Sequence, residues 1–369
     1  MKILHTSDLH FGISLCGVPL LPYQKSFLTT LSSAAENADA VIISGDIFDT
    51  SVASSEAVKC WSELATELCI TKKIPVIVCA GNHDGAARLA SCSDLLKSAG
   101  LYISGTLEDA FTPTIIGDTA IYSLPYFNPA DGAVLLNCKP DSASVMKAAA
   151  EKILAEADKS KTLILAAHCF AAGGKASESD ISARAAESVG GAENIPLSAF
   201  EGFDYVALGH LHKAHTISAD GAETIIRYSG TPLPYSFSEA QHQKSVTIFD
   251  TKTKEITEIE IPSPYNLRTL SGTYNELLST AETDMCRNDF MKISVTDRYA
   301  GDNIYMHFKE LYPNLLHFTG KQIEASGAAA EITAKEAAEL DIISLAKRYS
   351  KDRRGTEPDQ DELKWLAEA

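Results

Sequence analysis

Five segments in the first 212 residues share one design, in which a short apolar run ends in side chains that bind metals. In the clearest of them, residues 41–49, the apolar run stops at Gly45, and the carboxylates of Asp46 and Asp49 follow. A single Gly-Asp pair after a strand is most often an ordinary turn, so the repetition of the design is what indicates a site. The donors at the five ends are Asp8, His10, Asp46, Asn82, His168, His210 and His212.

These donors are carboxylates, imidazoles and one amide, without a thiolate, and such a set suits manganese, iron or zinc. On extended backbone, the D-x-H at 8–10 and the H-x-H at 210–212 each place both donors on the same side. We therefore expect two metal ions. The expected division gives the first ion Asp8, His10 and His212 and the second Asn82, His168 and His210, with Asp46 as the bridge.

Two divalent ions about 3.5–4 Å apart clamp the oxygens of a phosphoryl group and hold a hydroxide that attacks phosphorus in line. The donor set therefore predicts hydrolysis of a phosphoester. His83 directly follows Asn82, so on extended backbone it points elsewhere, and we expect it to be the general acid for the leaving oxygen. Asp49 is expected to hold the His83 ring. The alternative is that Asp49 caps the helix that follows.

The elements that must position these residues alternate along the chain as they do in α/β proteins. Apolar runs predict strands at 2–6, 41–44, 75–80, 162–167 and 205–208, with short strands between 102 and 125. Apolar periodicity predicts helices at 23–38, 56–68, 86–98 and 142–159, the second of them capped by Ser54. The strands form a largely parallel or mixed sheet, whose strand ends are where ligands bind. The apolar stripe of helix 86–98 indicates core packing, with a second copy of the chain as the alternative.

The pattern changes after the last donor pair. Residues 171–191 lack periodicity and predict a mobile loop beside the site. Residues 224–228, 245–250 and 255–261 are typical of antiparallel strands, and prolines near residue 265 indicate a boundary. A strand at 290–297, a helix at 303–311 and a strand at 315–318 predict a small α+β module. The expected division of the chain is therefore 1–265, 266–326 and 327–369.

Two helices are expected in the last segment. Thr333 caps the first, which runs to about Tyr349, and the second covers 359–367 with Leu363, Trp365 and Leu366 on one face. A tail this short cannot bury these side chains by itself. We expect it either to fold back on the body or to dock on a partner protein.

Composition sets the outer limits. The chain has 369 residues, of which 45% are hydrophobic and 22% charged, and we expect one large domain and a smaller one. We see no signal peptide and no membrane-spanning stretch. The eight cysteines are scattered and predict reduced thiols in a cytosolic protein. A net charge of −17 argues against a generic nucleic-acid binder, although two bound divalent ions would attract phosphate locally.

The motifs also carry a family resemblance. D-x-H at 8–10, GD-x-x-D at 45–49, GNHD at 81–84, His168 and GHLH at 209–212 resemble the five-motif signature of the calcineurin-like metallophosphoesterases. Within that superfamily, MKILHTSDLHFG, GDIFDT, YVALGHLH and YSGTPLPYSF are similar to the SbcD family of bacterial nuclease subunits. The resemblance covers residues 1 to about 260.

The resemblance implies a four-layer α/β/β/α fold and manganese-dependent hydrolysis of DNA phosphodiesters, with 3′-to-5′ exonuclease activity on double-strand ends and endonuclease activity on hairpins. It implies that residues 266–326 cap the DNA, and that the C-terminal helices bind the coiled coil of an SbcC-type ATPase in a heterotetramer containing two copies of this chain. DNA repair in the cytoplasm, at the nucleoid, would be the setting. Lys213, Arg227 and Tyr235 follow the last metal motif and are candidate DNA contacts.

Two other functions fit part of the pattern. A phosphatase of the same fold would share every metal ligand, because fold does not fix the substrate. A non-enzymatic scaffold would keep the fold and bind a partner through its tail, but the intact donor set speaks against it.

Overall fold

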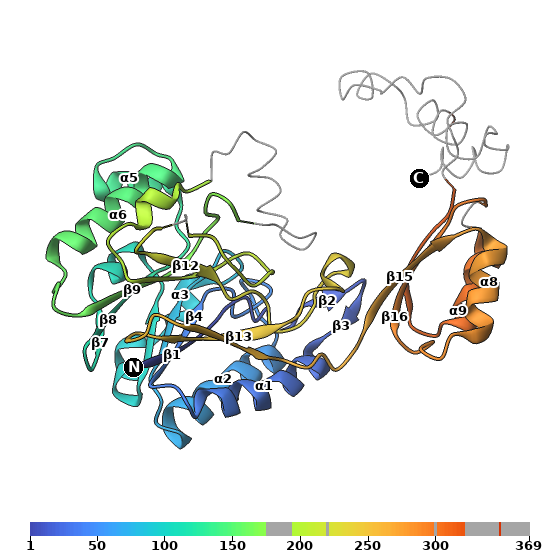
Figure 1. Ribbon diagram of the computed structural model, residues 1–369, viewed down its shortest axis with the longest axis horizontal. Helices are drawn as coiled ribbons and strands as arrows, with labels where there is room; N and C mark the ends of the chain where they lie inside the picture. The colour runs from blue at the N-terminus through green and yellow to red at the C-terminus, as the bar shows by residue number, and fades with distance from the viewer. Residues whose placement is uncertain (175–193, 219–220, 299–300, 322–346, 348–369) are drawn as a thin grey trace, which may run out of the picture.

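Two six-stranded sheets stacked face to face form the body of the protein in the computed structural model, which describes residues 1–174, 194–218, 221–298, 301–321 and 347 (Figure 1). The first sheet has the order β14-β13-β1-β4-β5-β6. Its strands are β1 (Lys2–Thr6), β4 (Ala40–Ser44), β5 (Val76–Cys79), β6 (Leu101–Ser104), β13 (Ser245–Asp250) and β14 (Ile256–Glu260).

The second sheet has the order β11-β12-β10-β9-β8-β7. Its strands are β7 (Thr114–Ile116), β8 (Thr119–Leu124), β9 (Thr162–His168), β10 (Tyr205–Gly209), β11 (His215–Thr216) and β12 (Ile225–Tyr228). The prediction of antiparallel strands at 224–228, 245–250 and 255–261 is confirmed in part. β13 and β14 pair with each other antiparallel, whereas β12 lies in the other sheet, antiparallel to β11 on one side and parallel to β10 on the other. The strands β2 (Ser14–Leu15) and β3 (Val18–Pro19) form a separate short β-hairpin.

Helices cover both outer faces of the pair of sheets, which gives the expected four layers (Figure 1). On the first sheet lie α1 (Leu21–Ala35), α2 (Ser55–Thr66, continued by a π turn, Glu67–Thr71), α3 (Ala86–Leu89) and α4 (Ser93–Leu96). On the second lie α5 (Pro129–Leu136) and α6 (Ser142–Glu156). Single 3-10 turns occur at Lys97–Ala99, Leu107–Phe111, Leu197–Phe200 and Phe237–Glu239.

The helix predictions are mostly confirmed. Ser54 caps α2, its side chain accepting a hydrogen bond from the Ala57 amide. The helix expected at 86–98 is instead broken into α3 and α4, because Cys92 between them has a left-handed backbone (φ 61°). Leu95, predicted on the apolar stripe of that helix, is 74% exposed.

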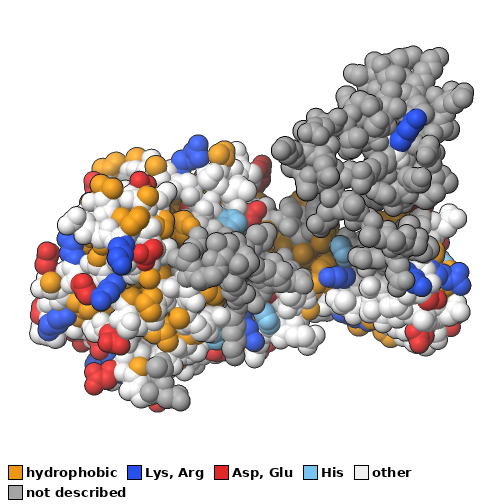
Figure 2. Space-filling model, turned by 90° about the horizontal axis from the view of Figure 1, so that it is seen from above, with side chains coloured by type: hydrophobic (Ala, Val, Ile, Leu, Met, Phe, Trp, Pro, Cys, Tyr) orange, Lys and Arg blue, Asp and Glu red, His pale blue; other side chains and the backbone are white. Residues whose placement is uncertain are grey.

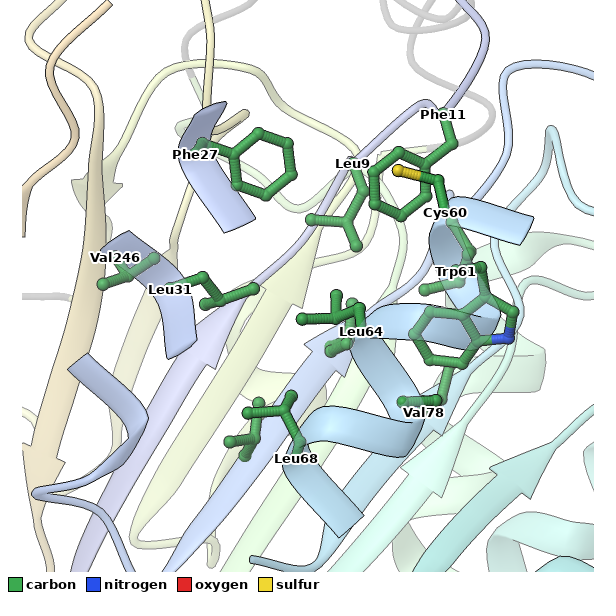
Figure 3. Close-up of a cluster of buried hydrophobic side chains, with 14 of the residues drawn as sticks. Leu9, Phe11, Phe27, Leu31, Cys60, Trp61, Leu64, Leu68, Val78 and Val246 are labelled. Carbon is green, nitrogen blue, oxygen red and sulfur yellow. The ribbon is translucent and has the colours of Figure 1, made fainter. Parts of the chain in front are cut away.

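Side-chain alternation on the strands builds three separate apolar layers. In β4, Ala40 and Ile42 point between the two sheets, where they meet Ile3 and Tyr205, whereas Val41 and Ile43 point towards the helices. Figure 3 shows this helix-side layer, in which Phe27 and Leu31 of α1 lie at one side, Trp61 of α2 at the other, and Leu9 and Leu64 between them. A third layer lies between the second sheet and α6. A strand buried on both faces cannot shift its register cheaply, so the strand ends are fixed in position.

A smaller module follows the body. It contains the parallel sheet β15-β16-β17 (Leu267–Gly272, Phe290–Val295 and Leu315–Thr319) and the helices α8 (Tyr274–Thr283) and α9 (Asp302–Leu311). The helices lie on the side of the sheet away from the body (Figure 1), with an apolar cluster of their own beneath them. We call residues 266–321 the cap. The strand, helix and strand expected between 290 and 318 correspond to β16, α9 and β17.

Several predictions fall on other parts of the chain. The loop expected at 171–191 lies mostly, and the two C-terminal helices almost entirely, outside the described residues, which are all the atoms not drawn in grey in Figure 2. All eight cysteines are free, as expected from their spacing. Among the described helices there is none whose length and hydropathy would suit a membrane span.

Candidate metal centre

All seven predicted donors lie at one edge of the two sheets, because the parallel strands that carry them end there. Three strand ends of the first sheet and two of the second contribute. Asp8 and His10 follow β1, Asp46 follows β4, Asn82 follows β5, His168 ends β9, and His210 and His212 follow β10.

The backbone at these strand ends has a conformation that residues other than glycine rarely adopt. Four of the donors have positive φ angles: Asp8 (52°), His10 (44°), Asp46 (50°) and His210 (103°). Each such residue costs about 1–3 kcal/mol, and clusters of them are typical of functional sites. The strained geometry turns the donors inward instead of along the strands.

Two glycines make room for the donors. A Cβ atom at Gly45, whose φ is +87°, would lie 2.2 Å from Nδ1 of His168. A Cβ atom at Gly81 would lie 2.1 Å from Oδ1 of Asp46. Both separations are far below a van der Waals contact, so a side chain at either position would displace a donor.

His10 indicates most directly that the first group of donors is built for a cation. It is 2% exposed, and within the described part of the chain neither of its ring nitrogens has a hydrogen-bond partner. An unpaired buried polar group costs about 1–3 kcal/mol, a penalty that coordination of a metal would remove. Asp8, His10 and His212 offer one atom each within 4.8 Å of one another. These residues fit the ligand set expected for the first ion.

The second group centres on the Asn82 amide. Its Oδ1 lies 2.8 Å from Nε2 of His168 and 3.1 Å from Nδ1 of His210. Nδ1 of His168 lies 2.9 Å from the Ser44 carbonyl oxygen. Because a carbonyl only accepts, this nitrogen carries the hydrogen, which leaves Nε2 as the atom for a metal.

Asp46 lies between the two groups. Its Oδ2 is 3.6 Å from Nε2 of His10 and 3.4 Å from Nε2 of His168. One oxygen therefore faces both sets of donors, which is the position that a bridging ligand needs. Asp8, Asp46 and His168 also form a group whose ligand atoms lie within 4.8 Å of one another.

Burial and mutual charge shift the pKa values of these residues in opposite directions. Burial raises the pKa of Asp8 to about 6 and lowers that of His210 to about 3. For Asp46, burial acts to raise the pKa, but the nearby His168 imidazole outweighs it and holds the pKa well below its usual range. The same pairing raises the pKa of His168 to about 9 against the effect of its burial. In the metal-free chain, ionised carboxylate and imidazolium thus compensate each other at the centre of the site, and a bound metal would displace the proton on Nε2 of His168.

Glu239 and Lys244 support His212 from behind, and sequence reasoning missed both. Oε1 of Glu239 lies 3.4 Å from Nδ1 of His212, and Nζ of Lys244 donates to the His212 carbonyl at 3.0 Å. Lys244 also donates to Glu239 at 2.5 Å. All three residues are buried. A carboxylate behind a histidine ligand fixes its tautomer and raises its basicity.

Gln24 and Tyr235 hold the loop that carries Asp8 and His10. Nε2 of Gln24 donates to the carbonyls of Leu9 and His10 at 2.9 and 2.8 Å, and the Tyr235 hydroxyl donates to Leu9 at 2.6 Å. Gln24 lies on α1 and had no motif to mark it. These contacts explain how the strained loop is maintained.

Asp84, the last residue of the GNHD motif, ties two donor loops together. Its carboxylate accepts from the backbone amides of Gly81, Ile47 and Phe48 at 2.9, 3.2 and 3.0 Å. It therefore bridges the loop after β5 to the loop after β4. Burial, with the negative Asp46 nearby, raises its pKa to about 6.

His83 and Asp49 are in contact, but not through the atoms expected. Nδ1 of His83 lies 2.7 Å from the backbone carbonyl oxygen of Asp49, whereas the Asp49 carboxylate lies 3.6 Å from Nδ1 of His10. The expected carboxylate–imidazole pair is therefore corrected to a carbonyl–imidazole pair. The His83 ring packs edge-on against His10 with centroids 4.8 Å apart, beside the first donor group.

Two of the three candidate DNA contacts are placed inside the protein. Arg227 is 4% exposed, and its guanidinium donates to Thr247, Thr216 and Glu258. Tyr235 is 4% exposed and supports the ligand loop. Neither side chain reaches the surface, so both are corrected to structural roles. Lys213 is half-buried and remains a candidate.

Comparison with known proteins agrees with this geometry. Residues 1–214 match the family model described as calcineurin-like phosphoesterase. The chain is 29% identical to the SbcD subunit of nuclease SbcCD from Staphylococcus epidermidis, over 99% of this chain and 98% of the relative. It is 30% identical to the SbcD subunit from Staphylococcus saprophyticus, over 88% of this chain and 86% of the relative.

A solved structure from a study of YfcE, a phosphoesterase from E. coli, aligns with 71% of this chain and 100% of that chain, at 12% identity and a TM-score of 0.30. A superposition this loose adds nothing to the assignment.

Proposed function

This chain belongs to the calcineurin-like phosphoesterases and, within them, to the SbcD family of nuclease subunits, and we propose that it cuts DNA by a two-metal hydrolysis of phosphodiesters. We include in the proposal 3′-to-5′ exonuclease activity on double-strand ends and endonuclease activity on hairpins, in DNA repair, recombination and replication at the nucleoid. The observation that carries it is the position of Asp46 Oδ2 between two groups of donors. One of these groups contains His10, whose ring nitrogens have no hydrogen-bond partner among the described residues.

Asp8, His10 and His212 would hold the first metal ion, and Asn82, His168 and His210 the second, with Asp46 shared. When bound, the two ions polarise the phosphoryl oxygens and provide a nucleophile at neutral pH. Manganese is our choice of metal because the donors are carboxylate, amide and imidazole without a thiolate. The names of the relatives indicate a nuclease subunit, but they do not say which metal ion it binds.

The protein's own residues then position the substrate and move a proton. Because Nδ1–H of His83 donates to the Asp49 carbonyl, Nε2 is the atom that would give a proton to the leaving oxygen when the ring is protonated. Asp46 Oδ1 accepts from the His83 backbone amide at 2.9 Å, which fixes the acid relative to the metal ligands. Protonation by His83 prevents negative charge from building on the departing group.

The cap offers a surface for the DNA backbone. On the face of its sheet opposite the helices, Phe290 packs against Tyr23 of α1, with ring centroids 5.7 Å apart. Further along the same face, Lys292 pairs with Thr269 and His317, and Ser294 pairs with Ser271 and Thr319. A lysine, a histidine and hydroxyls without a carboxylate suit phosphate oxygens. Lys213, beside the metal ligands, is a second candidate contact.

The partner proposals rest on the family and on exposed apolar surface. The relatives are named as subunits of SbcCD, and we propose that an SbcC-type ATPase binds residues 327–369, which lie almost wholly outside the described residues. Val52, Val58, Ile70 and Leu95 expose apolar surface on and around α2 and α4. We propose that this face joins two copies of the chain within the heterotetramer. Light scattering of the purified chain tests the dimer.

The experiment that tests the function uses a labelled linear duplex and a DNA hairpin, with manganese, magnesium or EDTA, and with and without the ATPase partner. We expect manganese-dependent cutting that disappears in Asp46→Ala. A phosphomonoester assayed in parallel separates the two possible activities. If both DNA substrates remain intact with the partner present while the phosphomonoester is hydrolysed, the protein is a phosphatase and the proposal is wrong.

A further inference from the structure

We propose that Tyr126 is a substrate-binding residue that stacks on the nucleobase of the nucleotide whose phosphate is cleaved. The inference rests on the proposed DNA nuclease function. It extends that function by naming a residue that recognises the base, whereas the metal centre recognises only the phosphate. No motif marks Tyr126, and it has no role in the chemistry derived above.

The position of Tyr126 follows from the sheet. It comes just after β8, the neighbour of β9, so it emerges at the same sheet edge as His168. Its backbone amide donates to the Ala80 carbonyl at 2.8 Å, which ties it to the segment leading into Asn82. Its ring centroid lies 6.5 Å from that of His168, with the two rings nearly perpendicular. The aromatic ring is therefore held beside the second donor group.

Its exposure distinguishes Tyr126 from the strand it follows. All six residues of β8 are buried, whereas Tyr126 is 43% exposed. A single exposed aromatic residue is ordinary on a protein surface. This one, however, lines a shallow crease together with Phe127, Phe170 and the two donors His168 and His210. The crease joins aromatic surface directly to metal ligands.

The chemical class that suits the exposed ring of Tyr126 is a nucleobase, which would stack on the ring without entering the crease. Every base has a flat π face, so stacking on an aromatic side chain is tolerant of sequence, as an enzyme acting on DNA ends requires. A phosphate or a sugar hydroxyl gains nothing comparable from the ring. Stacking also requires an exposed face of the base, so only a base at the end of a duplex, or one that has left the stack, can use the ring.

The relative positions of Tyr126 and His83 assign the two sides of the scissile bond. His83 packs on His10 in the first group, and Tyr126 packs on His168 in the second. When the bond from phosphorus to the leaving oxygen breaks, that oxygen takes a proton from His83, and the oxygen of water forms the new bond to phosphorus. The water releases one proton to solvent, from which His83 regains its own. The phosphate stays on the nucleoside stacked at Tyr126. In a 3′-to-5′ exonuclease this nucleoside is the one released.

The test compares Tyr126→Ala with the unmodified chain, in manganese and with the ATPase partner, on a duplex with a normal or an abasic 3′-terminal nucleotide. We expect kcat/KM for the normal duplex to fall about tenfold or more, as for loss of one base–aromatic stack. With the terminal base already missing, the same substitution should change kcat/KM by less than about twofold. Methyl p-nitrophenyl phosphate, a diester without a base, supplies the reference rate, and the ratio of DNA to diester turnover should fall about tenfold.

Three variants make the result specific. Tyr126→Trp keeps a stacking ring and should stay within about threefold of the unmodified chain. Tyr126→Leu keeps apolar bulk without a π face and should resemble Tyr126→Ala. Val134→Ala removes an apolar side chain that is 86% exposed on the adjacent α5, away from the crease, and should not change either rate.

Several outcomes would overturn the inference. Equal losses on the normal and abasic duplexes, or a matching loss on the diester with less bound manganese, would mean that Tyr126 acts through His168. Unchanged cleavage of the normal duplex by Tyr126→Ala would exclude stacking. Failure of the unmodified chain to cut any DNA would instead contradict the proposed function, which separates the two claims.

Discussion

Nδ1 of His83 is held at 2.7 Å by the backbone carbonyl of Asp49, and the carboxylate of the same Asp49 is turned towards His10. The ring of the proposed general acid is thus oriented by main chain, which any residue at position 49 supplies. The carbonyl and the carboxylate of Asp49 therefore have separate roles, whereas the sequence analysis expected the carboxylate to hold the His83 ring.

Asp49→Ala should therefore retain most activity, with a loss of less than about tenfold. His83→Gln should lose about 10²–10⁴-fold in kcat while still binding metal, because it removes general acid catalysis only. DNA cleavage and manganese content of the two variants check both. A loss in Asp49→Ala as large as in His83→Gln would restore the carboxylate to the catalytic role.

Gly45→Ala should prevent metal binding at the second site, because the new Cβ would lie 2.2 Å from Nδ1 of His168. Gly17→Ala is the matched control: its φ of +84° imposes a similar backbone strain, but no atom lies within 4 Å of the added Cβ. Each variant should lose about 1–2 kcal/mol of stability from the left-handed backbone. Manganese titration distinguishes them, and equal metal affinities would show that the contact at Gly45 is unimportant.

Glu239→Gln should lower manganese affinity by about 10–100-fold, as for loss of a carboxylate behind a histidine ligand. Glu258→Gln provides the control, since that carboxylate pairs with Arg227, is 49% exposed and contacts no metal donor. Titration calorimetry on both variants measures the effect. A loss of affinity in both would point to general destabilisation.

The free energy of unfolding of the metal-free chain should fall on acidification through His5. Its Nε2 lies 3.2 Å from the Leu208 carbonyl and its Nδ1 lies 2.9 Å from the Tyr205 hydroxyl, so the folded ring is neutral. Burial, with Arg227 nearby, lowers its pKa from 6.5 to about 3. Below pH 6.5 the unfolded chain binds a proton that the folded chain does not, so stability is lost as the pH falls towards about 3.

The contribution of His5 is isolated by comparison with His5→Gln, which does not titrate. Denaturant unfolding in EDTA should give the parent chain a slope steeper by up to about 1.4 kcal/mol per pH unit between about pH 6 and 4. The metal ligands titrate in both proteins and cancel. Parallel curves would show that His5 takes up its proton in the folded state.

Lys292→Ala in the cap should weaken DNA binding on every sequence and reduce the salt dependence by about one phosphate contact, a change of about 0.9 in the slope of log K against log salt. Lys147→Ala, on α6 with a side chain 67% exposed, should leave the slope unchanged. Fluorescence anisotropy at several salt concentrations measures both. Equal slopes for Lys292→Ala and the parent chain would remove this face from the DNA contacts.

The sequence was most informative where chemistry constrains it. Donors such as Asp8, Asn82 and His168 follow apolar runs, and parallel strands oblige their ends to meet, so the cluster was predictable from the residues. The four layers were expected only from the family resemblance, because the residue pattern by itself predicted one largely parallel or mixed sheet. Helix 86–98 was not, because the left-handed backbone at Cys92 has no local cause that periodicity detects.

Contacts between distant parts of the chain were also beyond sequence reasoning. Gln24 and Glu239 touch the donor loops only after folding, and neither belongs to a motif. Arg227 was predicted to contact DNA because it follows the last metal motif. Its place in β12, between β11 and β10, buries it instead, and partners from three other segments satisfy its guanidinium. Burial of this kind depends on which strands become neighbours.

The left-handed backbone at Asp8, His10, Asp46 and His210 has a consequence for metal exchange. The two sheets and their three apolar layers already hold these bends, so folding does not wait for an ion to shape the loops. Small metal-dependent domains behave in the opposite way and unfold when stripped. Here a chelator should leave an intact template that can be reloaded with a different cation. The metal ion bound in a cell would then depend on which ions are available there more than on which ion was present when the chain folded.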